Sequence, residues 1–199
     1  MAEDDNACSV AHGETAPGSP QAQASPQAQA APHPAPEAAP GVRQEQAAQR
    51  ALVAAFASAV SGYLLRYAAD AGYRTVLVEP DPARAAGARM AGFTVTDAMP
   101  GNLDGADVVV TDHHRDELGY LLRDALAAKA RWVGIMGNPH HAGPHVAALE
   151  ALGVAPGEIA RVHRPIGLNI GSRTPPEIAL STLAGLIADR NARPGGFAF

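Results

Sequence analysis

The run DVVVTD, residues 107–112, constrains the fold of this chain more than any other segment. Its three consecutive valines leave no polar face, so a strand formed here must be covered on both sides. Strands of that kind are typical of parallel sheets with helices on both faces, whereas antiparallel strands usually alternate apolar and polar residues. The run therefore predicts an α/β fold.

Similar strand patterns alternate with helical patterns along the chain. The apolar residues of the helical segments recur at intervals of three and four, and glycines follow several of these segments, as they do at helix ends. We predict strands at 51–56, 75–79, 93–97, 107–112 and 131–137, and helices at 60–72, 83–92, 117–129, 145–153 and from 175 onward. Because strands separated by helices are joined by right-handed crossovers, we expect a Rossmann-like, doubly wound parallel sheet.

The composition of the chain changes near residue 48. Residues 15–40 are almost entirely Ala, Pro, Gln, Ser and Glu. Such a segment has too little apolar bulk to offset the roughly 1–2 kcal/mol of backbone entropy that each ordered residue loses. We expect a disordered N-terminal tail over residues 1–48, a Rossmann-like domain over 49–191 and a flexible C-terminal tail over 192–199.

Charge and cysteine content exclude several classes of protein. The net charge of −5 lacks the clustered cations that nucleic-acid and anionic-membrane binding require. No run approaches the roughly 18 apolar residues that span a bilayer, and the first residues are acidic where a signal peptide is basic. The only cysteine, Cys8, excludes an internal disulfide. We therefore expect a cytoplasmic protein that binds neither nucleic acid nor membrane.

The loops after the strands are the candidate ligand site, because ligands of such sheets bind outside the carboxyl ends of the strands. The first loop contains Ala57, Ser58, Ser61 and Gly62, and it takes the place of a GxGxxG turn with only one glycine. Glu79 follows the second strand about 20 residues on, where dinucleotide-binding folds carry the acid that accepts a hydrogen bond from ribose. These five residues are candidate contacts of an adenosine-type nucleotide.

The loops after the fourth and fifth predicted strands are rich in histidine. Asp112 and His113 follow the valine run, Gly137 opens the next loop, and the two loops hold five of the eight histidines. A metal site is one interpretation. A proline at the expected helix start keeps His141 and His145 off one helical turn, however. We therefore expect no metal ion and take Asp112, His113 and Gly137 as contacts of an organic ligand.

A glycine-rich loop precedes the last predicted helix. Thr174 is expected to cap this helix, with proline at the first helical position and a glutamate three residues on completing a capping box. Free amide groups, the helix dipole and Arg173 would then form an anion site, which Gly167, Asn169 and Gly171 extend. The alternative is a well-capped helix whose arginine pairs with a surface carboxylate.

The run VHRPIGLNIGSRTPPEIALSTLAGLIADR, residues 162–190, closely resembles the signature of the XdhC/CoxI family, the xanthine dehydrogenase accessory proteins. The segments TVLVEPDPARA, VVVTDHHRDEL and RWVGIMGNPHHAGPHVAALEALGV are similar to parts of the family's C-terminal Rossmann domain. The resemblance covers roughly residues 51–190. It implies a protein that accepts molybdenum cofactor, assists its sulfuration and delivers it to an apo-hydroxylase of the xanthine or carbon monoxide dehydrogenase type.

The chain also departs from the family pattern. Nothing in residues 1–49 matches the smaller N-terminal domain, the first turn lacks the glycines of GAGxVA, the common DHD motif is Asp-His-His here, and Asn169 replaces an aspartate. The resemblance therefore implies either a ligand-binding half that works with a separate protein supplying the missing domain, or a relative that has lost cofactor chemistry.

Two functions remain open. The favoured one is a non-catalytic maturation factor that binds molybdenum cofactor (molybdopterin), or a related nucleotide, for a molybdenum hydroxylase client. The alternative is an NAD(P)-dependent oxidoreductase, which needs an intact glycine turn and a proton donor such as a Tyr-x-x-x-Lys pair, and the sequence contains neither. The apolar helix 178–188 also offers a face to a second subunit, which makes a homodimer a further expectation.

Overall fold

The structure is a computed structural model that describes residues 50–137 and 143–196. Six parallel strands form one sheet in the order β3-β2-β1-β4-β5-β6. The strands are β1 (Ala51–Ala55), β2 (Arg74–Val78), β3 (Val95–Thr96), β4 (Ala106–Val110), β5 (Trp132–Ile135) and β6 (Val162–His163). This order confirms the predicted Rossmann-like, doubly wound α/β fold. The expected N-terminal tail, residues 1–48, lies outside the described residues, and the boundaries of both tails stay predictions.

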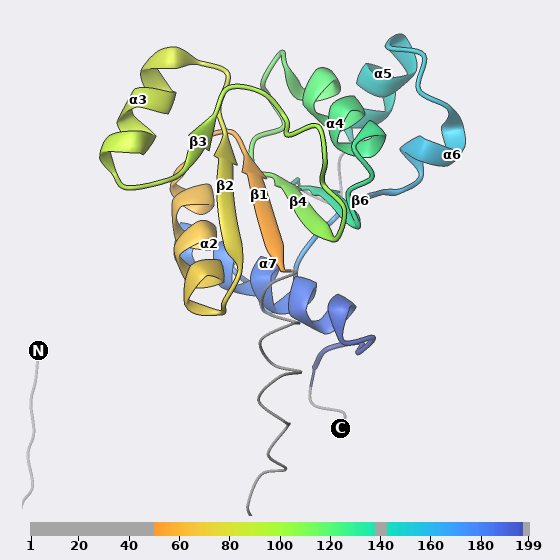
Figure 1. Ribbon diagram of the computed structural model, residues 1–199. Helices are drawn as coiled ribbons and strands as arrows, with labels where there is room; N and C mark the ends of the chain where they lie inside the picture. The colour runs from red at the N-terminus through yellow and green to blue at the C-terminus, as the bar shows by residue number, and fades with distance from the viewer. Residues whose placement is uncertain (1–49, 138–142, 197–199) are drawn as a thin grey trace, which may run out of the picture. The chain divides into compact units, whose positions relative to one another are not determined.

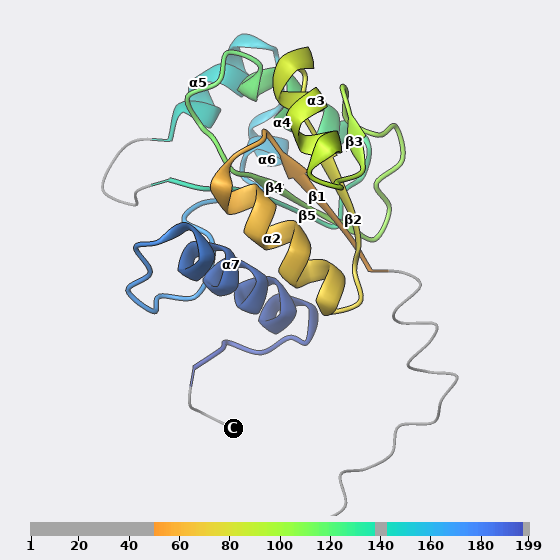
Figure 2. The same cartoon turned by 90° about the vertical axis from the view of Figure 1, so that its left-hand side faces the viewer.

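Helices cover both faces of the sheet (Figures 1 and 2). On one face α2 (Ala59–Asp70) and α7 (Pro175–Arg190) pack side by side, and α4 (Leu118–Ala127) and α5 (Pro144–Ala151) pack on the other. The short helix α3 (Pro82–Met90) connects β2 to β3, and α6 (Pro156–Ile159) leads into β6. No helix within the described ranges has the combination of length and apolar character that a membrane crossing requires.

The valine run forms the central strand β4, as its sequence predicts. All five residues of β4 are buried. Val108 and Val110 pack into the core beneath α4 and α5, whereas Val109 packs into the core beneath α2 and α7. The strand therefore contributes side chains to both cores, which explains why it has no polar face.

The order of the strands reverses between β1 and β4. From β1 the chain crosses to β2 and β3 on one side, and from β4 it continues to β5 and β6 on the other. Ala55 lies opposite Val110 in the register of the two strands. The segments that follow these residues therefore leave the sheet side by side, and this switch point is where a crevice is expected in such folds.

A buried ion cluster at the opposite edge of the sheet fixes α7. The carboxylate of Asp107, on β4, is fully buried and accepts hydrogen bonds from Arg131 and Arg190, both at 2.7 Å. Arg190 also donates to the carbonyl of Gly105 at 2.7 Å. The last turn of α7 is thereby held against the sheet, which sets the position of the helix that later forms one wall of the site.

Two short elements, β6 and α6, were absent from the predicted set. β6 is a two-residue edge strand and α6 is a single turn, so neither is long enough to show apolar periodicity. The start of α7, in contrast, is as predicted. Thr174 is the N-cap, Pro175 is the first helical residue, and Glu177 completes a capping box.

Candidate functional site

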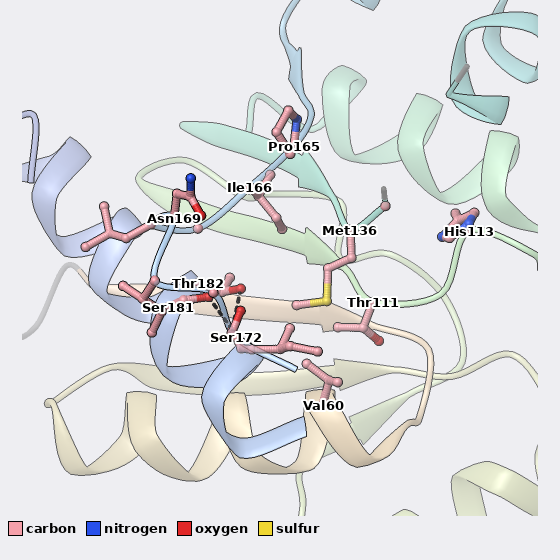
Figure 3. Close-up of a pocket in the computed structure, with 16 residues that line it drawn as sticks. Val60, Thr111, His113, Met136, Pro165, Ile166, Asn169, Ser172, Ser181 and Thr182 are labelled. Atoms are coloured by element: carbon pink, nitrogen blue, oxygen red, sulfur yellow. Dashed lines mark hydrogen bonds between the residues drawn. The ribbon is translucent and has the colours of Figure 1, made fainter. Parts of the chain in front are cut away.

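A cavity of about 720 Å³ opens at the carboxyl ends of β4 and β5 (Figure 3). Its walls come from the first turn of α2, the loops after β4 and β5, the loop 165–172 and the inner face of α7. The lining residues are Val60, Thr111, His113, Met136, Gly137, Pro165, Ile166, Gly167, Leu168, Asn169, Ile170, Gly171, Ser172, Ile178, Ser181 and Thr182. The volume is in the range of sites for small molecules and cofactors.

Five of the predicted contacts line this cavity. They are His113, Gly137, Gly167, Asn169 and Gly171. They come from three loops that are far apart in the sequence, and the parallel sheet brings all three loops to one edge. The predicted convergence of strand-end loops is therefore present in the structure, while their contact with a ligand stays a prediction.

Several lining residues were not among the predicted contacts. Thr111 lies just beyond β4, Met136 just beyond β5, and Ser181 and Thr182 are buried on the inner face of α7. Both α7 hydroxyls donate to the carbonyl of Ile178, at 3.0 and 2.8 Å. A pair of hydroxyl residues within the otherwise apolar run of α7 is the sequence signal that identifies this wall.

Among the described residues, the lining of the cavity carries no formally charged side chain, since it contains no Asp, Glu, Lys or Arg. The only one of these described lining groups that titrates near neutrality is the imidazole of His113. Partial burial, followed by the nearby His114 and Arg164, lowers the pKa of His113 below its usual value. The imidazole is therefore neutral at pH 7, and the cavity offers hydrogen-bonding groups rather than net charge.

The loop 165–172 packs tightly on α7 through Gly167. This glycine has a φ of 89°, and a Cβ atom placed on it would lie 3.0 Å from the hydroxyl of Ser181 and 3.1 Å from the backbone nitrogen of Thr182. The N–H of Leu168 donates to the carbonyl of Ser181 at 3.0 Å. A side chain at residue 167 would therefore push the loop off the helix, so the position requires glycine.

Five N–H groups of this loop have no hydrogen-bond partner among the described residues. They belong to residues that all line the cavity, namely Ile166, Gly167, Asn169, Gly171 and Ser172. An N–H group of this kind is a donor for a ligand oxygen, and a series of them in a loop is a common way to bind an anion. The loop itself therefore has the capacity to bind a phosphate.

The first turn of α7 does not have the free donors that the sequence predicted. Glu177 accepts hydrogen bonds from the N–H groups of Arg173 and Thr174, at 2.9 and 3.0 Å. These bonds lower the pKa of Glu177, so its carboxylate is ionised at neutral pH. The first two helical residues are prolines, which have no N–H. The positive end of the helix dipole is thus already neutralised by the chain's own glutamate.

Arg173 and Thr174 are exposed and do not line the cavity. The guanidinium of Arg173 forms no ion pair with any residue of the described ranges. The alternative expectation, that this arginine pairs with a surface carboxylate, is therefore not met by a side-chain contact. Arg173 directly follows the lining residue Ser172, just as Arg164 directly precedes the lining residue Pro165.

The residues of the predicted first turn line a different and smaller cavity of about 250 Å³ between α2 and α3. Ser58 caps α2 and forms a capping box with Ser61. The N–H of Ser61 donates to the Ser58 hydroxyl at 3.0 Å, and the N–H of Ser58 donates to the Ser61 hydroxyl at 2.8 Å. Ala57 and Gly62 line the same small cavity. The structure therefore separates these four predicted contacts from the other group.

Glu79 lies beneath the first turn, with a fully buried side chain. One carboxylate oxygen accepts from the N–H of Ala57 at 2.7 Å. The other accepts from the N–H of Asp81 at 2.9 Å and from the guanidinium of Arg115 at 3.2 Å. The structure leaves this carboxylate no exposed oxygen with which to contact a ribose.

The remaining predicted contact, Asp112, makes a local turn. Its carboxylate accepts from the N–H of His114 at 3.0 Å, and Asp112 does not line the cavity. The rings of His113 and His114 are 4.0 Å apart between centroids. Within 50–137 and 143–196, no three His, Cys, Asp or Glu side chains are grouped as metal ligands are. His141 lies outside these ranges.

The family model of the XdhC Rossmann domain matches residues 52–186 of this chain. The chain belongs to the XdhC family. The matched range includes every residue that lines the larger cavity. The loop 165–172 and the start of α7, where the sequence resemblance is strongest, are therefore the part of the XdhC domain that builds the wall of this site.

Two further proteins are similar to the chain. YqeB of Escherichia coli (strain K12), an uncharacterized protein, is 35% identical over 89 residues, which cover 45% of this chain and 16% of YqeB. A crystal structure of a xanthine dehydrogenase from Bacillus halodurans, at 2.80 Å resolution, is 21% identical with a TM-score of 0.56, and the match covers 75% of this chain and 44% of that protein. The second likeness shows a shared fold. The chain spans less than half of either protein.

Proposed function

We propose that this XdhC domain binds molybdenum cofactor, or a related nucleotide, in the larger cavity, and that it serves the maturation of a xanthine or carbon monoxide dehydrogenase-type molybdoenzyme. The observation that carries the proposal is the loop 165–172. It belongs to the matched XdhC domain, lines a cavity of cofactor size, and has five N–H donors with no partner in the described part of the chain. The proposed role is binding and transfer, and we assign no catalytic residue.

The chemistry of the lining is compatible with molybdopterin, which has a neutral pterin ring and one terminal phosphate. The pterin edge requires neutral donors and acceptors, and Asn169 and Ser172 supply these. The phosphate requires N–H groups and a nearby cation, and the N–H groups of Gly171 and Ser172 together with Arg173 are the residues that would hold it. When bound, the cofactor supplies the molybdenum centre that the client enzyme uses.

The proposal assigns cofactor binding to this chain but not sulfur transfer. Sulfuration by a protein requires a reactive thiol. The only cysteine is Cys8, which lies outside the described residues, so no described residue that lines the cavity carries a thiol. We therefore place the source of the sulfur on another protein.

The oxidoreductase alternative is less compatible with the site. An NAD(P)-dependent enzyme of this fold uses the first turn for pyrophosphate and the acid after β2 for ribose. Here the N–H groups of Ala57, Ser58 and Ser61 are bonded within the chain, and Glu79 is fully buried. These contacts favour the carrier function.

We propose two kinds of partner. One is the molybdenum hydroxylase that receives the cofactor, and the other is a protein that supplies the N-terminal domain found in XdhC relatives. A homodimer through α7 is a further proposal: Leu180 is 54% exposed on this helix, whereas Ala179, Leu183 and Leu186 are already packed against α2. We propose the cytoplasm as the location, since the reducing cytoplasm suits an unpaired cysteine.

Calorimetric titration of the full chain with molybdopterin tests the proposed function. We expect one binding event per chain in the parent protein. Val60→Trp inserts a large side chain from the α2 wall of the cavity and should weaken binding by more than about tenfold, the equivalent of 1.4 kcal/mol. Ala59→Trp is the matched control, because Ala59 is exposed and does not line the cavity.

The two variants give a clear decision. Equal affinity of Val60→Trp and Ala59→Trp would show that the cofactor binds elsewhere. No heat of binding in the parent protein, with the fold intact, would contradict the carrier function itself.

A further inference from the structure

We propose that the chain's own side chains close the β1–α2 half of the Rossmann crevice, so that the site accepts a ring compound with a single phosphate and rejects a dinucleotide. The identity of that ring compound rests on the proposed function, whereas the closure does not. Three sets of contacts carry the inference: the hydrogen bonds of the first turn, the link across the switch point, and the burial of Glu79.

The first turn has few donors left for a pyrophosphate. In open Rossmann sites the N–H groups of this turn and of the first helical residues bind the diphosphate. Here the N–H groups of Ala57, Ser58 and Ser61 donate to Glu79, Ser61 and Ser58, at 2.7, 2.8 and 3.0 Å. Among the described residues of this turn, only Ala59 and Val60 have N–H groups without a partner. Val60 lines the larger cavity.

A hydroxyl pair spans the switch point between β1 and β4. The hydroxyl of Ser58 donates to that of Thr111 at 3.1 Å, and the Thr111 hydroxyl faces the carbonyls of Ala55 and Phe56 at 3.1 and 3.0 Å. Thr111 lines the larger cavity and Ser58 lines the smaller one. A dinucleotide would have to extend across this link to occupy both cavities.

Arg115 donates a hydrogen bond to Glu79, the acid that would contact ribose in a dinucleotide-binding site. It reaches Glu79 from the segment between β4 and α4, at 3.2 Å, and it also contacts Glu117 at 3.2 Å. Its guanidinium lies over the ring of Phe56, 4.8 Å from the centroid. Arg115 therefore takes the place of ribose hydroxyls as a donor to Glu79, and the pair is shielded from solvent, with the two side chains 14% and 0% exposed.

The two cavities differ in size in the same sense. The smaller one, between α2 and α3, has a volume of about 250 Å³ against about 720 Å³ for the larger. The smaller value lies below the roughly 300 Å³ at which ligand pockets usually begin. The space beside the first turn is thus smaller than most ligand pockets as well as poor in donors.

An NMR titration with backbone amide resonances assigned tests the closure on the intact chain. We expect that ADP and NAD leave the resonances of residues 57–62 unchanged at millimolar concentration. Shifts at residues 57–62 in the parent protein would overturn the proposal. Molybdopterin tests the proposed function in the same spectra, through shifts at 169–172. An absence of those shifts would contradict the carrier role and leave the closure standing.

A gain-of-binding variant tests which side chains close the site. Ser58→Gly with Ser61→Ala releases the two capping hydrogen bonds and the link to Thr111, and adding Arg115→Met releases Glu79. The triple variant should bind ADP at least about tenfold more tightly than the parent, with new shifts at residues 57–62, because each recovered contact to a charged group is worth about a factor of ten or more.

The variant series has its own control for folding. If Arg115→Met unfolds the domain, the double variant alone should stay folded and show a smaller gain, since glycine replaces serine at a helix cap with little loss of stability. A folded variant, recognised by a dispersed amide spectrum, that gains no affinity for ADP would show that these side chains do not close the site.

Discussion

The starts of α2 and α7 have the same local design and opposite consequences. Both helices begin at the same edge of the sheet, and both begin with a capping box, Ser58 with Ser61 and Thr174 with Glu177. In each box the helix's own donors are bonded to side chains of the chain. Neither helix terminus is therefore a free anion site, although each resembles one in sequence.

The difference lies in what precedes each helix. Before α7 runs the loop 165–172, which lines the larger cavity and has N–H groups without partners in the described residues. Before α2 there is only a short turn, and its first N–H group, that of Ala57, donates to the carboxylate of Glu79. The comparison shows that unused donors at this edge belong to a loop, and that a helix start whose amides are already bonded does not supply them.

The largest expected effect is a loss of stability from a substitution in the β1–α2 half of the crevice, the half that we propose is closed. Glu79→Ala removes a fully buried carboxylate, leaves two N–H groups without their acceptor, and leaves Arg115 with Glu117 alone of its two carboxylate partners. Loss of one partner of a buried pair costs about 3–5 kcal/mol. Urea denaturation should show a loss of this size, whereas Glu150→Ala, on an exposed position of α5, should stay within about 0.5 kcal/mol. A loss below about 1 kcal/mol for Glu79→Ala would show that the pair does not hold the turn.

The second prediction concerns stability in the half of the crevice that holds the larger cavity. It compares two glycines of the loop 165–172. Gly167 and Gly171 both have positive φ, 89° and 69°, but only Gly167 packs against α7. Alanine at either position costs about 1–2 kcal/mol for the left-handed backbone, and at 167 overpacking adds about 1–3 kcal/mol. Gly167→Ala should therefore lower the free energy of unfolding clearly more than Gly171→Ala. Equal losses would show that the loop moves freely off the helix.

The sequence predicted the half of the crevice that holds the larger cavity better than it predicted the β1–α2 half. Strand ends, the loop 165–172 and the start of α7 are local features, and parallel topology alone brings residues 113, 137 and 167–171 together. The partner of the Glu79 carboxylate is not a local feature, because it is Arg115, which is 36 residues away in the sequence. Spacing identifies an acid after β2 but does not show whether that acid faces a ligand or an arginine of the same chain.

Capping chemistry also limits what the sequence indicates about a site. The sequence indicated the capping box at Thr174, yet the same box supplies the glutamate that occupies the amides of the predicted anion site. A capping box and an anion site at one helix start compete for the same donors. The short strand β6 could not be found for a different reason, since two residues show no alternation.

A third prediction concerns the effect of pH on the larger cavity, which His113 lines. The pKa of His113 is lowered chiefly by burial, then by His114 and Arg164. The folded chain thus binds this proton only below the usual value of about 6.5, so the contribution to stability is present above that pH and is lost as the pH falls. In the same range the cavity gains a positive charge.

Affinity for a phosphate-bearing ligand should therefore rise on acidification below about pH 6.5, by up to about tenfold for one added charge contact. His113→Gln should remove the rise. His145→Gln is the control, because His145 is buried and does not line the cavity, although burial lowers its pKa too. An unchanged pH profile in His113→Gln would show that the phosphate does not lie near this imidazole.

The smallest expected effect separates the loop from the helix start as the anion site. In Glu177→Gln the side chain keeps an oxygen that accepts from the N–H groups of Arg173 and Thr174, so the helix start should stay intact, but it loses the negative charge. In the parent protein the carboxyl group of Glu177 is ionised at neutral pH, because hydrogen bonds from the backbone N–H groups lower its pKa. If the phosphate binds to the loop donors at Gly171 and Ser172, it lies near this carboxylate and is repelled by it.

Removing the charge should then raise the affinity for inorganic phosphate about two- to fivefold at low ionic strength, and the gain should shrink as salt screens the exposed site. Glu177→Ala distinguishes the two locations, because it also frees both N–H groups. A further gain in Glu177→Ala over Glu177→Gln would mean that the helix start binds the anion once its own glutamate is gone. Equal gains in the two variants would place the phosphate on the loop, and no gain in either would move it away from this end of the cavity.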